Sequence, residues 1–235
     1  MKKIGLIGGM SWESTQIYYN VLNQKVKALL GKFHSAKIVI DSVDFSVIHK
    51  LQVENDWDAL DREMIEAATN LKNAKAEMIL ICANTMHLCS DAIAQNVDLP
   101  LIHIAEATGE KIKEAGLKKV LLLGTKFTME RDFYKNILTN DFGVEVLVPK
   151  EVDREIVHNI IYEELVQGEI DAGSRRQYIR IIEEAIINGA EGVVLGCTEI
   201  PLLIEPSDVS IPTFNTTQIH AEKAVEFALS TSLVN

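Results

Sequence analysis

The feature that most constrains the fold of this chain is an internal repeat of three segments at nearly constant spacing. The paired segments are residues 3–9 and 119–125, residues 78–85 and 192–199, and residues 99–104 and 211–216. The aligned positions 3 and 119, 83 and 197, and 99 and 211 give offsets of 116, 114 and 112 residues. Any two buried strands look alike, so one such pair would mean little. Three pairs in the same order predict two lobes of similar fold, related by a pseudo-two-fold axis.

The repeated segments belong to a regular alternation of strand-like and helix-like stretches. Short apolar runs bounded by Gly, Asn or Pro alternate with longer stretches of helical period, which is typical of an α/β protein with parallel strands. We predict strands at residues 3–7, 37–43, 78–82, 101–104, 119–123, 145–148 and 192–195. The clearest predicted helices are residues 56–75, residues 177–188 before Gly189, and residues 221–229.

The repeat also sets the predicted domain organisation of the 235 residues. We expect a first α/β lobe from residues 1–98 and 209–235 and a second α/β lobe from residues 99–208, each built on a parallel sheet. Open parallel sheets bind ligands outside the carboxyl ends of their strands. The active site is therefore predicted in the crevice between the two lobes.

Charge and hydropathy exclude two classes of partner. The formal net charge is −11, so a polyanion such as nucleic acid would be repelled, and we expect no nucleic-acid partner. A small acidic substrate is not excluded, because backbone N–H groups and one or two cations can reverse the sign of the potential locally. No run approaches about 18 consecutive apolar residues, and the N-terminus leads directly into a predicted strand. We therefore expect a cytoplasmic protein with no membrane partner.

The cysteines, histidines and glycines do not form a cofactor motif. Cys82, Cys89 and Cys197 include no C-x-x-C pair, which argues against a disulfide framework and against a zinc site. The histidines are scattered without metal-ligand spacing, so no metal is expected. Gly8-Gly9 lacks the G-x-G-x-x-G spacing of a dinucleotide-binding turn. We expect no cofactor.

The residues that directly follow two of the repeated strands carry the candidate chemistry. They are Ala83-Asn84-Thr85 in the first repeat and Cys197-Thr198-Glu199 in the second. A racemase without a cofactor must remove the proton beside a carboxylate from one face and return a proton to the other, which calls for acid/base groups on both sides. Asn84, Thr85 and Thr198, with their backbone amides, would bind the α-carboxylate and stabilise the negative charge that develops on it.

Five stretches carry a resemblance to a known family. They are Gly8-Gly9-Met10-Ser11-Trp12-Glu13-Ser14-Thr15, Asn84-Thr85-Met86-His87, His103-Ile104-Ala105-Glu106-Ala107-Thr108, Leu123-Gly124-Thr125-Lys126-Phe127-Thr128-Met129-Glu130 and Gly196-Cys197-Thr198-Glu199-Ile200. On these stretches the chain resembles the aspartate/glutamate racemase family, in particular its bacterial aspartate/glutamate-specific subgroup, over essentially its whole length. The resemblance implies two similar lobes with the site between them, an acidic amino-acid substrate, a homodimer, and catalysis without metal, nucleotide or pyridoxal phosphate.

Residues of the second repeat and one histidine are further candidates for catalysis, and the resemblance itself assigns the assisting role to Glu199. Cys197 would be the catalytic thiol, and its pKa would be lowered if helix N–H groups point at it. Glu199 would assist Cys197 by orienting it or relaying a proton. His87, four residues after Ala83, would be either a structural residue or a direct participant in catalysis.

Further residues are expected to bind the substrate. Met10 and Ser11 follow the first glycine turn, at the place that Thr125 takes in the second repeat, and both turns should border the crevice. By the resemblance, Gln52 would approach the end of the substrate's side chain. The alternative is that Gln52 is a solvated loop residue.

Position 83 departs from the family pattern. The family carries Cys or, in this subgroup, often Thr directly before Asn-Thr, whereas this chain has Ala83, whose methyl group cannot exchange a proton. Cys82 stands one residue earlier, and alternation along a strand should point it away from the crevice unless the strand has already ended. The alternatives are that Cys82 substitutes for the missing acid/base residue, that it is a buried core residue, or that Ala83 is an engineered replacement. Racemisation with an incomplete acid/base pair is therefore the expected function. The alternatives are a decarboxylase of the same fold with a single thiol, and a catalytically silent amino-acid binding protein.

Overall fold

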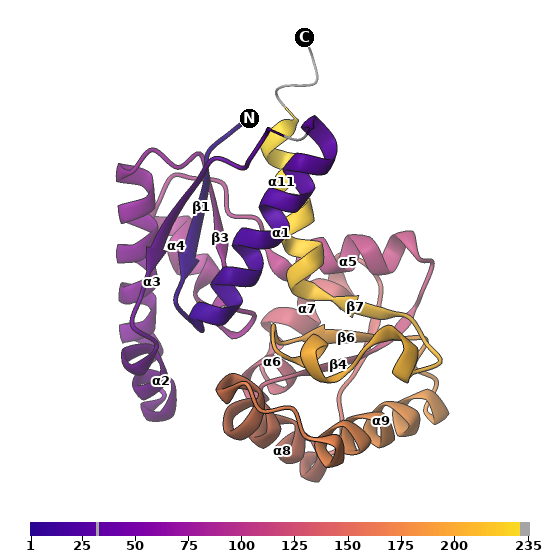
Figure 1. Cartoon of the computed structure of the whole chain (residues 1–235). Helices are drawn as coiled ribbons and strands as arrows, with labels where there is room; N and C mark the ends of the chain where they lie inside the picture. Colours follow the sequence, from indigo (N-terminus) through magenta and orange to yellow (C-terminus); the bar gives the residue numbers. More distant parts are fainter. Residues whose placement is uncertain (32, 231–235) are drawn as a thin grey trace. The chain divides into compact units, whose positions relative to one another are not determined.

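The computed structural model describes residues 1–31 and 33–230 of the chain (Figure 1). The described residues divide into two compact units. The first unit comprises Met1–His103 and the residues from His220 onward, and the second comprises Ile104–Ile219. No described helix is long and apolar enough to cross a membrane.

The first unit is a three-stranded parallel sheet with helices on both faces. Its elements in chain order are β1 (Ile4–Gly8), α1 (Trp12–Leu30), β2 (Ile38–Ser42), α2 (Phe45–Glu54), α3 (Trp57–Asn73), β3 (Met78–Ile81), η1 (Thr85–Cys89), α4 (Ser90–Asn96) and most of α11 (Thr216–Leu229). The strand order is β2-β1-β3. Figure 1 shows α3 on one side of this sheet and α1 with α11 on the other.

The two faces of this sheet bury different sets of side chains. Met78 and Leu80 of β3 pack with side chains of α1 and α11, whereas Ile79 and Ile81 pack with side chains of α3 and α4. Because successive side chains of a strand point to opposite faces, a strand covered on both faces reads as a continuous apolar run. This is why residues 78–82 were recognisable as a buried strand.

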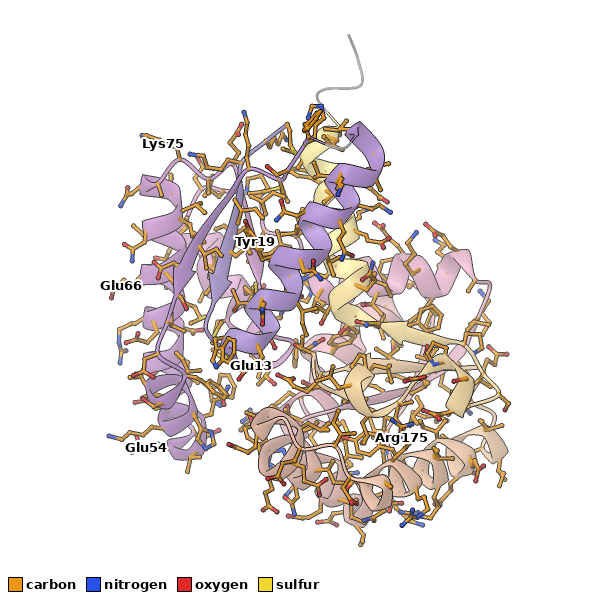
Figure 2. The ribbon with its side chains drawn as sticks, viewed as in Figure 1. Glu13, Tyr19, Glu54, Glu66, Lys75 and Arg175 are labelled. Carbon is orange, nitrogen blue, oxygen red and sulfur yellow. The ribbon has the colours of Figure 1, made fainter. Side chains whose placement is uncertain are left out.

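Helix α3 shows how a covering helix meets the sheet. Its buried residues recur at helical spacing and are Leu60, Met64, Ala67, Ala68 and Leu71. The side chain of Glu66 lies on the opposite, exposed face and points away from the ribbon in Figure 2. The helix therefore has the apolar stripe that burial against one sheet face requires.

The second unit has a four-stranded parallel sheet with the strand order β5-β4-β6-β7. Its elements in chain order are α5 (Ile104–Glu114), β4 (Lys119–Gly124), α6 (Lys126–Glu130), α7 (Asp132–Asn140), β5 (Glu145–Leu147), α8 (Glu151–Asn159), the π-helical turn η2 (Ile160–Glu164), η3 (Leu165–Gln167), α9 (Ala172–Ile187), β6 (Gly192–Gly196), α10 (Ile200–Leu203), η4 (Pro206–Asp208) and β7 (Thr213–Asn215). Side chains from α8, η2, α9 and α10 pack on one face of the sheet, and side chains from α5 and α7 pack on the other. The predicted α/β class with parallel sheets is confirmed.

Strand register reproduces the repeat that was read from the sequence. Ile7 of β1 pairs with Ile81 of β3, and Leu123 of β4 pairs with Leu195 of β6. Ala83 therefore lies two residues after Ile81, and Cys197 lies two residues after Leu195. The two positions are equivalent in the topology of their own units.

One predicted strand is wrong. Of residues 101–104, only Leu101 pairs, in a single bridge to Ile79, and Ile104 already begins α5. The equivalent segment of the second unit forms β7, which the strand prediction omitted, and Thr213 of β7 pairs with Val193. In the first unit, pairing with β3 stops after Leu101 because the chain begins helix α5 at Ile104.

Candidate active site

Cys197 directly follows β6 and is partly buried. Its Sγ donates a hydrogen bond to Oε2 of Glu199, with a sulfur–oxygen distance of 3.0 Å. Glu199 is itself only 6% exposed, so the carboxylate is held against the thiol and away from bulk water. The predicted partnership of these two side chains is present in the structure as a direct contact.

The electrostatics of Cys197 differ from the expectation. Burial, then the negative charge of Glu199 and the hydrogen bond to it, raise the pKa of the Cys197 thiol well above its ordinary value. The backbone N–H groups of Glu199 and Thr198 act in the opposite direction but contribute less. The predicted lowering of this pKa is therefore wrong, because desolvation and a neighbouring carboxylate outweigh the amides. At rest Cys197 is therefore a protonated thiol whose Sγ–H points at the Glu199 carboxylate.

Two tyrosines also lie in the electrostatic environment of Cys197. Burial first, and then the charges of Cys197 and Glu199, raise the pKa of Tyr162 above its usual range. Burial and the charges of Cys197 and Glu164 do the same for Tyr178, whose hydroxyl donates to the carbonyl of Val157 at 3.2 Å. Both phenols therefore remain protonated next to the thiol.

The sequence did not predict this environment, because it brings together Tyr162 of the π-helical turn η2 and Tyr178 of α9. Tyr162 lies in this turn, and its ring packs against His158 at 4.8 Å between centroids. Nδ1 of His158 accepts a hydrogen bond from the main-chain N–H of Lys126, at 3.2 Å. His158, at the end of α8, thus connects the turn after β4 with Tyr162 of η2. π-Helical turns are rare and often lie at functional sites, but no residue pattern marks this one.

The predicted equivalence of Ser11 and Thr125 is visible in their local geometry. Each is the N-cap of the helix that follows the first strand of its unit. Oγ of Ser11 accepts from the N–H of Ser14, and Oγ1 of Thr125 accepts from the N–H of Thr128, both at 3.3 Å. Serine and threonine are favoured at this position because the side chain satisfies a helix N–H that has no partner in the first turn.

The glycine turn before Ser11 requires a residue without a side chain. Gly9 has a φ of +90°, and a Cβ there would collide with the carbonyl oxygen of Val43. Met10 follows, 6% exposed, in the same core cluster as Ala83. The peptide bond between Met10 and Ser11 is cis. Met10 thus shares its immediate environment with the strand end of β3.

Gln52 is buried on helix α2, so its interpretation as a solvated loop residue is wrong. Its Nε2 lies 3.2 Å from Sδ of Met86, in the turn that begins with Asn84. Asn84 and Thr85 are 5% and 7% exposed. The structure therefore gathers Gln52 and the predicted carboxylate-binding turn in one buried region of the first unit.

Cys82 and Ala83 belong to opposite faces of the first sheet. Cys82 is fully buried in the cluster formed with α1 and α11, whereas Ala83 is 9% exposed and packs with the α3 side. Burial raises the pKa of Cys82 above its ordinary value. The predicted direction of Cys82, away from the side of Ala83, is confirmed, and this thiol is not placed to act for the missing side chain.

His87 lies beneath the same strand end. It is completely buried, and its Nδ1 donates to the carbonyl of Ala83 at 2.9 Å. Its ring packs against His103 and His220, with centroid distances of 4.8 and 5.4 Å. The sequence did not predict this cluster, because the three histidines are far apart along the chain.

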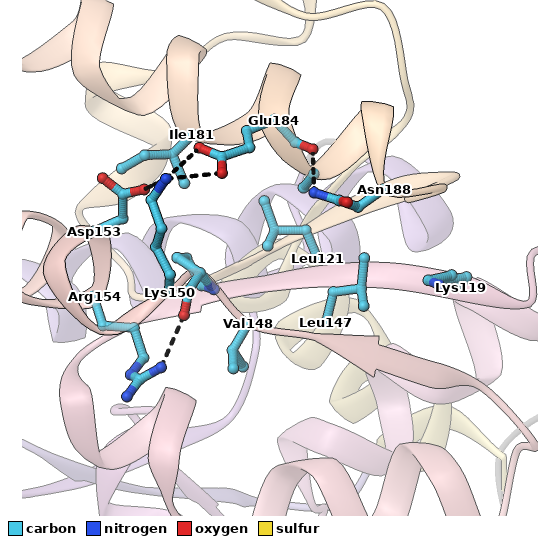
Figure 3. Close-up of a pocket in the computed structure, with 12 residues that line it drawn as sticks. Lys119, Leu121, Leu147, Val148, Lys150, Asp153, Arg154, Ile181, Glu184 and Asn188 are labelled. Atoms are coloured by element: carbon cyan, nitrogen blue, oxygen red, sulfur yellow. Dashed lines mark hydrogen bonds and ion pairs between the residues drawn. The ribbon is translucent and has the colours of Figure 1, made fainter.

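A separate groove lies on the second unit and has a volume of about 540 Å³ (Figure 3). Its apolar floor includes Leu121 and Leu147, and Nζ of Lys150 contacts the carboxylates of Glu184 and Asp153 at its rim. None of the predicted site residues lines this groove. Among residues 1–31 and 33–230, no group of His, Cys, Asp or Glu side chains is arranged to hold a metal ion.

Comparisons with known proteins agree with these observations. Residues 7–224 match the Asp/Glu/Hydantoin racemase family. A structure from Yersinia pestis assigned to the Asp/Glu racemases is 51% identical, with a TM-score of 0.92 over 97% of this chain and 100% of that chain. PH1733 from Pyrococcus horikoshii OT3, an aspartate racemase homologue, is 39% identical, with a TM-score of 0.84 over 97% and 99% of the two chains.

A more distant relative is the broad specificity amino-acid racemase RacX of Bacillus subtilis (strain 168). It is 22% identical over 239 residues, which cover 97% of this chain and 98% of RacX. The family match spans both units and includes the strand ends that carry Ala83 and Cys197. The chain belongs to the Asp/Glu/Hydantoin racemase family.

Proposed function

We propose that this chain is a cofactor-independent racemase of acidic amino acids, with aspartate or glutamate as the substrate. The observation that carries the proposal is the 3.0 Å hydrogen bond from Sγ of Cys197 to Glu199, which pairs an acid with a base at the end of a parallel strand. The Asp/Glu racemase assignment of the Yersinia pestis relative and the aspartate racemase homology of the Pyrococcus horikoshii relative support the substrate class.

The proposed reaction moves one proton at a time. Glu199 accepts the Sγ proton of Cys197, and the resulting thiolate removes the α-proton of the substrate, which restores the thiol. The electron pair left on Cα delocalises into the α-carboxylate, where the amides of Asn84, Thr85 and Thr198 would stabilise it. Gln52, Met10, Ser11 and Thr125 complete the proposed substrate-binding set.

The stereochemical result depends on where the proton returns. If the proton on Sγ is replaced by one from solvent and Cys197 then protonates the same face, the substrate exchanges its α-proton without inversion. Inversion needs a donor for the other face, and Ala83 occupies the position that the resemblance assigns to that donor. We therefore propose slow exchange of one enantiomer and weak net racemisation.

A second candidate is favoured by the protonation state of Cys197. A thiol that is protonated at rest has a proton ready to deliver to a carbanion from a single face, which is the last step of a decarboxylation. This reaction would need no second acid/base residue at position 83. A disubstituted malonate is the appropriate probe, and release of carbon dioxide from it would support this candidate.

The test is to incubate L- and D-aspartate and L- and D-glutamate separately in deuterated water with the chain. Deuterium uptake at Cα is followed by NMR, and inversion is followed by polarimetry. Exchange that disappears in Cys197→Ala supports the proposal. Substrate binding without any exchange would contradict it and identify an amino-acid binding protein. Treatment with a chelator should not change the exchange rate, because the proposed chemistry needs no metal.

Assembly is a separate proposal. From the resemblance we propose that two copies of the chain form a homodimer. Sedimentation velocity across a range of protein concentrations tests this, and a single monomeric species at every concentration would contradict it.

A further inference from the structure

We propose that His87 is a positioning residue of the first unit, which fixes the peptide between Ala83 and Asn84 so that the Asn84 amide can bind the substrate's carboxylate. This inference rests on the proposed function, since it assigns the role of His87 through that substrate. The imidazole does not act on the substrate itself in this assignment.

The carbonyl of Ala83 is bound by the side chain of His87. In η1 the main-chain N–H of His87 donates to the carbonyl of Asn84, at 3.1 Å, as expected for a 3₁₀ turn. The Ala83 carbonyl, one residue further back, is therefore not reached by that N–H. Nδ1 of His87 takes over this role and lies 2.9 Å from the Ala83 oxygen. Because a carbonyl only accepts, Nδ1 carries the proton of the neutral imidazole.

The planarity of the peptide fixes the direction of the N–H that follows this carbonyl. In a trans peptide the C=O of one residue and the N–H of the next point in opposite directions. A bond from His87 that holds the Ala83 carbonyl toward the buried imidazole therefore directs the Asn84 N–H away from it. This amide is among the groups proposed to stabilise the substrate's negative charge.

The imidazole of His87 is itself fixed in place by its neighbours. His220 receives a hydrogen bond at Nδ1 from the hydroxyl of Tyr18 and donates from Nε2 to the carbonyl of Ile102, both at 2.7 Å. The rings of His220 and His103 both pack on His87. His220, held by both bonds, thus fixes the His87 ring in place, and His103 adds a packing contact that a leucine side chain can replace.

The charge state of the cluster agrees with a fixed donor. Burial is the main cause that lowers the pKa of His87 well below its ordinary value, and His103 and His220 lower it further. Burial also lowers the pKa of His103 to about 4, against the opposing charge of Asp91, and that of His220 to about 3. All three rings are therefore neutral near pH 7, and His87 presents one N–H, at Nδ1.

The test compares His87→Asn, His87→Leu and the control His103→Leu. Asparagine carries a side-chain N–H the same number of bonds from Cα as Nδ1 of histidine, whereas leucine cannot donate. The KM and kcat for α-proton exchange of L-aspartate are measured for each variant. We expect His87→Leu to raise KM by about tenfold or more, because a misdirected amide loses a hydrogen bond to a charged group. His87→Asn should recover most of this loss.

His103→Leu separates positioning from packing, because it removes a ring from the same cluster without removing the bond to Ala83. Its KM should stay within about threefold of the parent value, a free-energy change below 1 kcal/mol. Equal increases of KM in His103→Leu and His87→Leu would overturn the proposal. So would a His87→Asn variant as impaired as His87→Leu.

NMR of the parent chain tests the inference independently of activity. The ¹⁵N shifts of His87 should show a proton on Nδ1 at pH 7, and the Asn84 amide shift should change more in His87→Leu than in His87→Asn. An unprotonated Nδ1 would overturn the proposal even if exchange is fast. If no exchange occurs but the NMR results are as expected, the proposed function fails and the positioning role stands. If His87→Leu does not fold, the parent spectrum and His87→Asn decide.

Discussion

The strand ends after β3 and β6 have equivalent positions in their units but different chemistry. After β6 the chain places a thiol at 3.0 Å from a carboxylate, whereas after β3 it places the methyl group of Ala83 in a core cluster. Both strands keep the same register with the first strand of their unit. The comparison teaches that the backbone of a repeat is maintained by burial of apolar strands, independently of whether the side chain at its end can exchange a proton.

The largest expected effect comes from removing the thiol that distinguishes the two strand ends. Cys197→Ala should lower the rate of α-proton exchange by about a thousandfold or more, since acid/base groups contribute roughly 10²–10⁴ in rate. Deuterium uptake from deuterated water measures this. Cys82→Ala is the matched control, because Cys82 is a thiol buried in the core. Racemisation that survives Cys197→Ala would show that the active strand end was wrongly assigned.

A gain of function should follow from making the two strand ends chemically alike. Ala83→Cys or Ala83→Thr would add a proton-transfer group for the second face and should raise the racemisation rate by about a hundredfold. Polarimetry with each enantiomer of aspartate and glutamate measures this. Ala83→Val is the control, because it matches threonine in shape without a hydroxyl. Equal rates for the valine and threonine variants would contradict the role of position 83.

The two units should also differ in acid sensitivity, because the first contains the buried histidine cluster whereas His158 of the second is only partly buried. His103 and His220 have folded pKa values of about 4 and about 3, below the ordinary value of 6.5. Lowered values mean that their contribution to stability is present above pH 6.5 and is lost as the pH falls. Between pH 7.5 and pH 5, each of these two histidines should lower the free energy of unfolding by about 2 kcal/mol, because it binds a proton more readily in the unfolded state.

Urea unfolding at several pH values measures this dependence. In His103→Gln the decrease in the free energy of unfolding between pH 7.5 and pH 5 should be smaller than in the parent chain by about 2 kcal/mol. His34→Gln is the control, since His34 is exposed. An unchanged pH slope in His103→Gln would contradict the assignment of the acid sensitivity to the cluster.

The smallest expected effect concerns the carboxylate that only the second strand end possesses. Glu199→Gln removes a negative charge and should lower the pKa of Cys197, because both the charge and the hydrogen bond of Glu199 raise it. The thiol should then react with iodoacetamide at lower pH. Exchange of the α-proton should fall by about tenfold, since amide oxygen is a poor proton acceptor. A higher pKa of Cys197 in this variant would contradict the assignment.

The fold was predictable from the sequence wherever burial on both sheet faces dictates apolar residues. The run at residues 78–82 identified β3, and alternation along it correctly gave the direction of Cys82. The repeat correctly related Ala83 to Cys197, because register follows the same apolar pattern in both units. The strand prediction failed at residues 101–104, where only Leu101 pairs with a neighbouring strand. No local sequence signal shows that the pairing stops after this residue.

The candidate site was predictable in its residue types but not in its electrostatics. The sequence identified Cys197 and Glu199 as neighbours, yet the sign of the thiol's pKa shift depends on burial and on a 3.0 Å contact that spacing alone does not give. The histidine cluster joins His87 to residues distant along the chain, so no local pattern could reveal it. Long-range packing decides such features.

Helix α11 completes the core of the first unit, although it follows the second unit along the chain. The core on one face of the first sheet contains Ala221, Ala224, Val225 and Ala228 together with Ile4 and Leu6. The N–H of Lys2 also donates to the carbonyl of Ala228, at 2.9 Å. These helix residues leave the ribosome after the whole of the second unit. During synthesis, the sheet face of the first unit that α11 covers therefore stays exposed until the second unit has been translated. The first unit begins at the N-terminus, yet its core is completed only after the second unit has been synthesised.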